Sequence, residues 1–178
     1  MQRSTTCVRV IILCLTVLGF AFPAAAQDVP KREFSIGYQF LRASQGGDTK
    51  NLLGGWYFDF AGNVNKMLGI VGGFGGGDRT FGTIEQHREE FMGGVRVSSR
   101  TNKQAVPFAQ VLGGAVRQTV GSFSKTDGGV QVGGGVNLMP KDRVGVRVGV
   151  DYLRVFTRGE GTNVVRFGVG VVGLFGTK

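Results

Sequence analysis

Six charged residues lie in segments whose other residues are mostly valine, phenylalanine or glycine, and their chemistry is the first question that the sequence raises. Each alternates with apolar neighbours, so the six side chains should point to the face of the strand opposite to those neighbours. They are Asp59, Glu90, Arg96, Arg147, Asp151 and Arg166. Charges removed from water must pair, because an unpaired buried charge is strongly destabilising. Acids and bases on one enclosed face predict either a packed salt-bridge network or a polar pathway for ions.

The single histidine, His87, is the other residue whose type suggests chemistry. It lies in a polar stretch, 78–88, with no serine beside it, and Ser98 and Ser99 follow one predicted strand later. Hydrolysis would need a nucleophile within reach of the imidazole, and a metal site would need further ligands. We therefore expect a solvated loop histidine, no catalytic or metal-binding residue and no cofactor.

The composition limits the class of protein. The chain has 178 residues, a formal net charge of +9, a hydrophobic share of 42% and 32 glycines. This length fits one domain, and the glycines follow no triplet repeat, which excludes collagen. Clusters such as Gly75–Gly77 and Gly133–Gly135 are not followed by the lysine of a phosphate-binding loop, so we do not expect nucleotide binding.

Residues 1–26 are typical of a secretory signal peptide, which leaves 27–178 as the predicted folded domain. Arg3 and Arg9 precede an apolar run over 10–22, and small residues over 24–26 provide the cleavage site. Both cysteines, Cys7 and Cys14, lie in the segment expected to be removed. The mature chain therefore has no disulfide framework and no thiolate metal site.

Period-two alternation is the main structural signal in 27–178. In the segment 144–154 the even positions up to 152 are four valines and a tyrosine, and the odd positions up to 151 are glycine, arginine or aspartate. Eight segments follow this scheme, each about 9–12 residues long, which suits a tilted bilayer crossing. The segment 106–117 allows both facings, because Gln110 interrupts the face shared by Phe108 and Leu112.

The connections between these segments indicate the architecture. Long connections alternate with short ones, and we predict them at 43–51, 61–66, 78–88, 99–105, 118–127, 139–143 and 156–163. Long outer loops and short periplasmic turns are typical of outer-membrane barrels. A closed sheet also pairs all backbone polar groups within lipid. We therefore predict an all-β fold, an eight-stranded antiparallel up-and-down transmembrane β-barrel, with the six charged residues pointing into its lumen.

Aromatic residues at the strand ends predict two girdles on the lipid-facing side. Those expected at the periplasmic end are Phe34, Phe60, Phe108 and Phe175. Those expected at the outer end are Phe74, Phe91, Tyr152 and Phe167.

Three stretches resemble a known family. The segment Pro107–Gly114 (PFAQVLGG), the segment Asp151–Arg154 (DYLR) and the ending from Arg166-Phe167 to Phe175 are similar to segments of small outer-membrane barrels of the OmpX/OmpA type. The resemblance covers nearly all of 27–178 and implies their eight-stranded fold, but no shared catalytic residue. In that family an aromatic usually ends the last strand and is read by the assembly machinery, whereas here three residues follow Phe175.

Charge placement bears on partners. The predicted long loops are each neutral, whereas the short turns and the tail are basic: Lys66, Arg100, Lys103, Lys141, Arg143 and Lys178 against Asp142. This pattern argues against an outer basic patch for lipopolysaccharide or nucleic acid. It fits either contact with anionic inner-leaflet lipids or simply solvated basic turns. We expect a monomer that meets outer-membrane lipids and, during insertion, the barrel assembly machinery.

The functional expectation is a Gram-negative outer-membrane protein with a structural or surface-interaction role, no enzymatic activity and a lumen filled by polar side chains. A narrow porin-like channel for ions or small solutes is the alternative. A lipid-modifying enzyme and a soluble ligand-binding barrel are less favoured. The loops name no specific partner, and the functional inference rests on analogy of fold.

Overall fold

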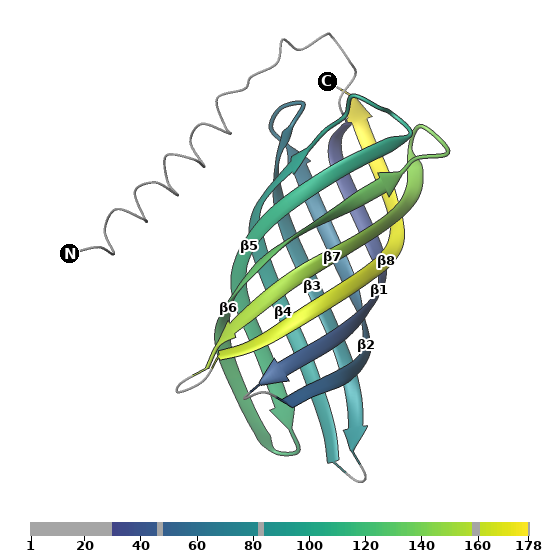
Figure 1. Ribbon diagram of the computed structural model, residues 1–178. Helices are drawn as coiled ribbons and strands as arrows, with labels where there is room; N and C mark the ends of the chain where they lie inside the picture. The colour runs from purple at the N-terminus through teal and green to yellow at the C-terminus, as the bar shows by residue number, and fades with distance from the viewer. Residues whose placement is uncertain (1–29, 46–47, 82–83, 158–160, 178) are drawn as a thin grey trace, which may run out of the picture.

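The computed structural model describes residues 30–45, 48–81, 84–157 and 161–177, which form a closed barrel (Figure 1). The predicted signal peptide, 1–26, lies outside these residues. Each strand pairs antiparallel with the next, and the last pairs with the first. The strands are β1 (Pro30–Gln45), β2 (Asp48–Asn63), β3 (Leu68–Phe81), β4 (Ile84–Ser98), β5 (Ala105–Val120), β6 (Phe123–Leu138), β7 (Val144–Phe156) and β8 (Gly161–Thr177).

Side-chain alternation explains why these residues form a barrel. In β7, Val144, Val146, Val148 and Val150 point outward and are 41–51% exposed, whereas Arg147 between them points inward and is 3% exposed. Valine favours the extended backbone, and closure of the sheet leaves no edge across the apolar band. The fold class is therefore the predicted one, an eight-stranded up-and-down transmembrane β-barrel. None of the described residues forms a helix that is long and apolar enough to cross a membrane.

The strands are 13 to 17 residues long, which exceeds the predicted length. Most of the difference lies at the distal end, by which we mean the end with the β1–β2, β3–β4, β5–β6 and β7–β8 connections. The predicted loops 43–51, 78–88 and 118–127 are wrong, because paired strands occupy most of each. A hairpin partner satisfies the backbone there even where the apolar alternation fades, so hydrophobic pattern alone ends the strands too early.

The opposite end, where β1 begins and β8 ends, is the terminal end. Its connections are short turns at 64–67, 99–104 and 139–143, close to the predicted 61–66, 99–105 and 139–143. In the first of these turns, the Asn65 side chain accepts hydrogen bonds from the amides of Met67 and Leu68, each at 2.8 Å. This Asx-type bonding satisfies the backbone of the turn.

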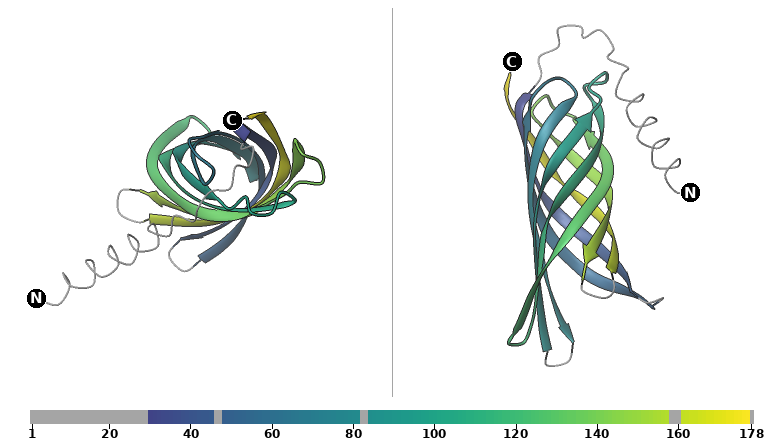
Figure 2. Two further views of the ribbon diagram at one scale, coloured as in Figure 1. Left: turned by 90° about the horizontal axis from the view of Figure 1, so that it is seen from above. Right: turned by 90° about the vertical axis from the view of Figure 1, so that its left-hand side faces the viewer.

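The barrel wall divides at the distal end into two sheets, which diverge in the right-hand view of Figure 2. The β2–β3 ladder ends at the pair Trp56–Gly76, and the β6–β7 ladder ends at Gly128–Phe156. The β3–β4 and β5–β6 ladders continue beyond these points to their hairpin turns. The distal parts of β3, β4, β5 and β6 therefore form a projecting sheet, separate from the distal parts of β7, β8, β1 and β2.

Inward-facing glycines allow the wall to curve tightly. A Cβ at Gly94 would collide with the backbone of Val111 on the neighbouring strand. At Gly72, which faces outward, a Cβ would meet nothing within 4 Å. Close backbone approach explains the first glycine and gives no reason for the second.

Candidate functional site

The terminal half of the lumen holds a salt-bridge cluster built on Glu33 and Asp59, which we call the terminal cluster. Arg147 donates to Asp59 at 3.2 Å and to Glu33 at 3.4 Å. Arg96 donates to Asp59 at 3.2 Å, and its guanidinium is 3.9 Å from Glu33. Arg100, from the β4–β5 turn, also pairs with Glu33. Each acid of the terminal cluster therefore faces at least two cations, which meets the need of a buried carboxylate to be paired.

A second cluster, the distal cluster, is built on Glu90 and Asp151. Arg166 bridges the two acids, pairing with Glu90 and donating to Asp151 at 3.2 Å. Arg88 donates to the other oxygen of Glu90 at 3.3 Å. Acids and bases balance, two against two, so the distal cluster carries no net charge.

Gln110 on β5 links the terminal and distal clusters. Its side-chain oxygen accepts from Arg96 at 2.7 and 3.0 Å, and its amide nitrogen donates to Asp151 at 3.0 Å. The result is one connected polar network along the lumen. Every carboxylate of this network has a cationic partner, which favours one arrangement of the wall.

The structure brings together all six charged residues that were assigned to the lumen, Asp59, Glu90, Arg96, Arg147, Asp151 and Arg166. Sequence reasoning missed Glu33, Arg88 and Arg100. The alternation of β1, continued one step before Ser35, would have found Glu33. The alternation of β4, continued one step beyond Glu90, would have found Arg88. Arg100 lies in a turn, where no periodic signal exists.

Phe108 is not a girdle residue, and that prediction is wrong. Its ring is 8% exposed and lies inside the barrel, with the guanidinium carbons of Arg96 and Arg147 at 4.8 and 4.7 Å from the ring centre. The even positions of β5 from Val106 to Leu112 are buried and face inward, so Phe108 shares the inner face with Gln110. The two guanidinium groups over the ring are favourable cation–π contacts.

The other seven predicted girdle residues lie on outward-facing positions. Five of them, Phe60, Phe91, Tyr152, Phe167 and Phe175, are 45–55% exposed. Phe34 and Phe74 are partly covered by other rings. Two contiguous aromatic groups result, one formed by Phe175, Phe34 and Phe58, the other by Trp56, Phe74 and Phe91.

Apolar inward-facing side chains fill the lumen beside the distal cluster. One step distal to the charged or polar residues of β5, β7 and β8 lie Leu112, Leu153 and Val164, all buried. Gln131 on β6 lies between Leu112 and Leu153 in the strand register and is 0% exposed. Among the residues that the structure describes, neither atom of its amide group has a hydrogen-bond partner. Burial of this amide without a partner is unfavourable.

The network borders a small cavity. A cavity of about 30 Å³ lies beside Tyr57, Arg147 and Arg166, next to the inward glycines Gly149 and Gly168. A water molecule needs about 10–15 Å³ on this measure, so the cavity holds one or two.

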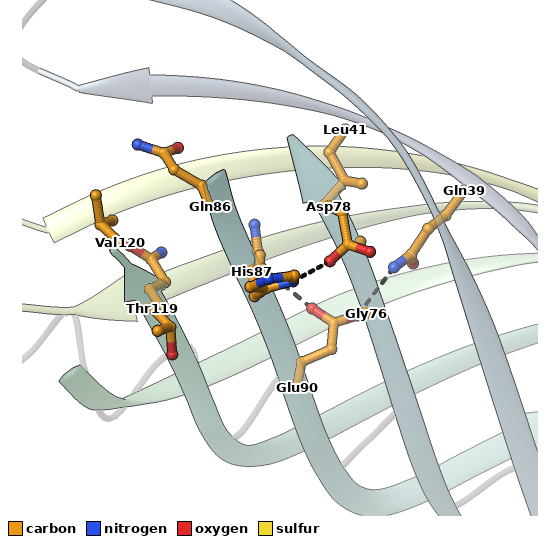
Figure 3. Close-up of a pocket in the computed structure, with 12 residues that line it drawn as sticks. Gln39, Leu41, Gly76, Asp78, Gln86, His87, Glu90, Thr119 and Val120 are labelled. Carbon is orange, nitrogen blue, oxygen red and sulfur yellow. Dashed lines mark hydrogen bonds and ion pairs between the residues drawn. The ribbon is translucent and has the colours of Figure 1, made fainter. Parts of the chain in front are cut away.

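A larger pocket of about 140 Å³ lies at the distal mouth of the lumen (Figure 3). Its lining comes from β1, β3, β4 and β5 and includes Gln39 and Glu90 at its polar side. We call it the distal pocket. It lies where β2 separates from β3, close to the last paired residue, Gly76.

His87 lines the distal pocket from strand β4, so its predicted place in a loop is wrong. It pairs in register with Asp78, and its Nδ1 atom is 2.5 Å from the Asp78 carboxylate. Thr119 lies opposite His87 on β5, and the Thr119 hydroxyl donates to Ser124 at 3.3 Å. Ser98 lies at the terminal end of β4, away from the imidazole.

Comparison with known proteins identifies the fold class of the chain. No family model and no curated protein sequence matches the chain. Among solved structures, neisserial surface protein A matches with a TM-score of 0.69 at 14% identity, over 82% of this chain and 97% of that one. Ail of Yersinia pestis, solved with the heparin analogue sucrose octasulfate, matches with a TM-score of 0.63 at 16% identity, over 83% and 99%.

OprG of Pseudomonas aeruginosa matches with a TM-score of 0.51 at 10% identity, over 84% of this chain and 98% of that one. At such identities the likeness is one of fold. The chain has the fold of the small eight-stranded outer-membrane barrels. Its architecture is that of the OmpX/OmpA type, as the sequence resemblance predicted.

Proposed function

We propose that the protein is a non-conducting, non-enzymatic outer-membrane barrel that presents its distal end to the outside of a Gram-negative cell and acts through that surface. The observation that carries the proposal is the connected lumen network, which joins the terminal and distal clusters through Gln110. This arrangement supports a structural role for the charged residues.

Permeation through the lumen would require the network to break. An ion or solute would have to pass Arg147 and Arg166, and the cavity between them has room for one or two waters. Removing one partner from a buried ion pair costs about 3–5 kcal/mol. Several such contacts lie in series, which favours a closed barrel over the porin-like alternative.

The projecting sheet supports a surface-interaction role. Residues 77–81 of β3 pair with β4 only, and residues 123–127 of β6 pair with β5 only. A strand edge offers backbone donors and acceptors to another extended segment. Two such edges on a sheet that stands beyond the barrel rim suit a docking surface for a protein partner.

Location and assembly complete the proposal. The signal peptide would export the chain, and the assembly machinery would insert it into the outer membrane as a monomer. The two aromatic groups would then lie at the lipid headgroup regions. A catalytic role lacks support, since the hydroxyl nearest to His87 in the strand register, that of Thr119, donates to Ser124.

Single cysteines test the proposed orientation, because the predicted mature chain contains none. Ser122→Cys places a thiol in the β5–β6 hairpin at the distal end, and Asn102→Cys places one in the β4–β5 turn at the terminal end. A membrane-impermeant maleimide added to intact cells should label the first variant alone. Labelling of Asn102→Cys alone, or of neither variant until the outer membrane is opened, would overturn the proposed orientation.

A further inference from the structure

The outward face of β7, β8 and β1, three neighbouring strands, carries two exposed arginines at its distal end (Figure 1). Arg154 on β7 lies between the buried residues Leu153 and Val155, and Arg42 on β1 follows the buried Leu41. Because side chains alternate along a strand, both arginines point away from the lumen. We call this surface the β7–β8–β1 face.

Neutral residues surround both arginines on the neighbouring strands. The residues directly opposite are Val165 and Asn51 for Arg42, and Asn163 and Val130 for Arg154. Arg117, an outward-facing arginine of β5, instead lies opposite Glu89. Within the described part of the chain, the β7–β8–β1 face therefore has a local excess of positive charge.

The strand register places Arg42 and Arg154 at the same height in the wall. The line of cross-strand partners that starts at Arg32 on β1 passes once round the barrel and returns to β1 at Arg42, ten residues nearer the distal end. Each step from one strand to the next therefore climbs by slightly more than one residue. Tyr152 reaches Arg42 in two such steps, so Arg42 lies two to three residues higher than Tyr152. Arg154 lies two residues higher than Tyr152 along β7.

Aromatic side chains lie directly below the two arginines. Phe40 and Tyr152 are the outward-facing residues that precede Arg42 and Arg154, and Phe167 lies opposite Phe40. The three rings are 45–56% exposed. Such rings are enriched where the hydrocarbon region of a bilayer meets the headgroups. The arginines, one outward position higher, therefore lie at the depth of the lipid headgroups.

The spacing of the two cations indicates the kind of headgroup. Neighbouring strands are about 4.8 Å apart and tilted, so the Cα atoms of Arg42 and Arg154 are about 12 Å apart around the barrel. A guanidinium group binds phosphate through two parallel hydrogen bonds. Two guanidinium groups at one height suit a headgroup with two phosphates, while its acyl chains lie along the apolar band below.

We propose that the β7–β8–β1 face binds lipid A, the bisphosphorylated glycolipid that anchors lipopolysaccharide in the outer leaflet. The choice of an outer-leaflet lipid rests on the proposed orientation, in which the distal end faces outward. The neutral charge of the predicted long loops does not bear on this site. Both arginines lie on strands, outside the predicted loops 43–51 and 156–163.

Native mass spectrometry can measure this preference on the full mature chain, folded in micelles of the uncharged detergent tetraethylene glycol monooctyl ether. The lipids, offered at equal concentration, are lipid A with both phosphates, the same lipid A after removal of its phosphates, phosphatidylglycerol and phosphatidylcholine. We expect retention of phosphorylated lipid A to be at least about tenfold stronger than that of the other three. Micelles have no leaflets, so this result does not depend on the orientation, which the single cysteines test separately.

Two double variants locate the site. Arg42→Gln/Arg154→Gln removes both cations and should weaken retention of phosphorylated lipid A at least about tenfold. Arg117→Gln/Lys125→Gln is the matched control, because it removes two exposed cations from the projecting sheet and changes the net charge equally. This control should bind as the parent does. Heat-modifiable gel mobility verifies that each variant is folded.

Several results would overturn the proposal. One is equal retention of lipid A with and without its phosphates, and another is unchanged retention by the folded Arg42→Gln/Arg154→Gln variant. An equal loss in the Arg117→Gln/Lys125→Gln control would show that net charge, and not this face, holds the lipid. Retention of phosphatidylglycerol as strong as that of lipid A would refute the choice of lipid A as the ligand.

Discussion

Replacing Arg147 with methionine removes the most highly connected cation of the terminal cluster while keeping a similar side-chain length. The guanidinium donates to Asn137 at 2.8 Å, to Ser35 at 2.9 Å, to Asp59 at 3.2 Å and to Glu33 at 3.4 Å. The substitution leaves all four acceptors with one donor fewer.

The expected loss of unfolding free energy depends on the ion pairs that remain after the substitution. Breaking a buried ion pair costs about 3–5 kcal/mol. Glu33 still faces Arg96 and Arg100, and Asp59 still faces Arg96, so neither acid is left alone. We therefore expect a loss near the lower limit, about 3 kcal/mol of unfolding free energy. In Arg147→Met/Asp59→Asn one charge of each sign is gone, so the double loss should fall short of the sum of the single losses by about 1–2 kcal/mol.

Urea unfolding in lipid vesicles, followed by the fluorescence of the single tryptophan, Trp56, measures these free energies. Arg154→Met is the matched control, because Arg154 lies on the same strand with its side chain exposed, and it should change stability by less than about 0.5 kcal/mol. If Arg147→Met costs no more than Arg154→Met, or if the Arg147 and Asp59 substitutions are additive, the terminal cluster does not stabilise the barrel as argued.

Two further predictions concern Gln131, whose buried amide has no partner among the described residues, and Gly94, where two backbones approach closely. Gln131→Leu should raise the unfolding free energy by about 1–3 kcal/mol, because it removes a buried amide without partners, and an unchanged or lower urea midpoint would show that the amide is satisfied. Gly94→Ala should lower the unfolding free energy by about 1–3 kcal/mol, since its Cβ meets the backbone of Val111, whereas Gly72→Ala should be nearly neutral. Equal effects of the two alanine substitutions in the same urea titration would refute the close-approach argument.

The architecture could be predicted from the sequence because its physical cause is periodic. Across β7, a side chain that faces lipid must be apolar and one that faces the lumen need not be, so the alternation shows both the strand and its facing. The same logic assigned Arg147 and Asp151 to the lumen before any pairing was known. Partner choice was not predictable, because it depends on strand register: Arg166 meets Glu90 across the lumen from a distant part of the chain.

The predictions that were wrong also have specific physical causes. Phe108 carries an apolar ring at an inward position, where two guanidinium groups favour an aromatic surface, so hydrophobicity misassigned its facing. The distal strand extensions have polar residues on both faces, so no alternation marks them, and backbone pairing with neighbouring strands maintains them. His87 was placed in a loop for the same reason.

The central claim is that the lumen network blocks the passage of ions through the barrel. Single-channel recording in planar lipid bilayers tests this claim most directly. The folded parent protein, inserted at a level verified by heat-modifiable mobility, should give no discrete conductance steps in a bilayer where a general porin gives them. Reproducible steps from the parent protein would contradict the account, since they would require a continuous path past Arg147 and Arg166.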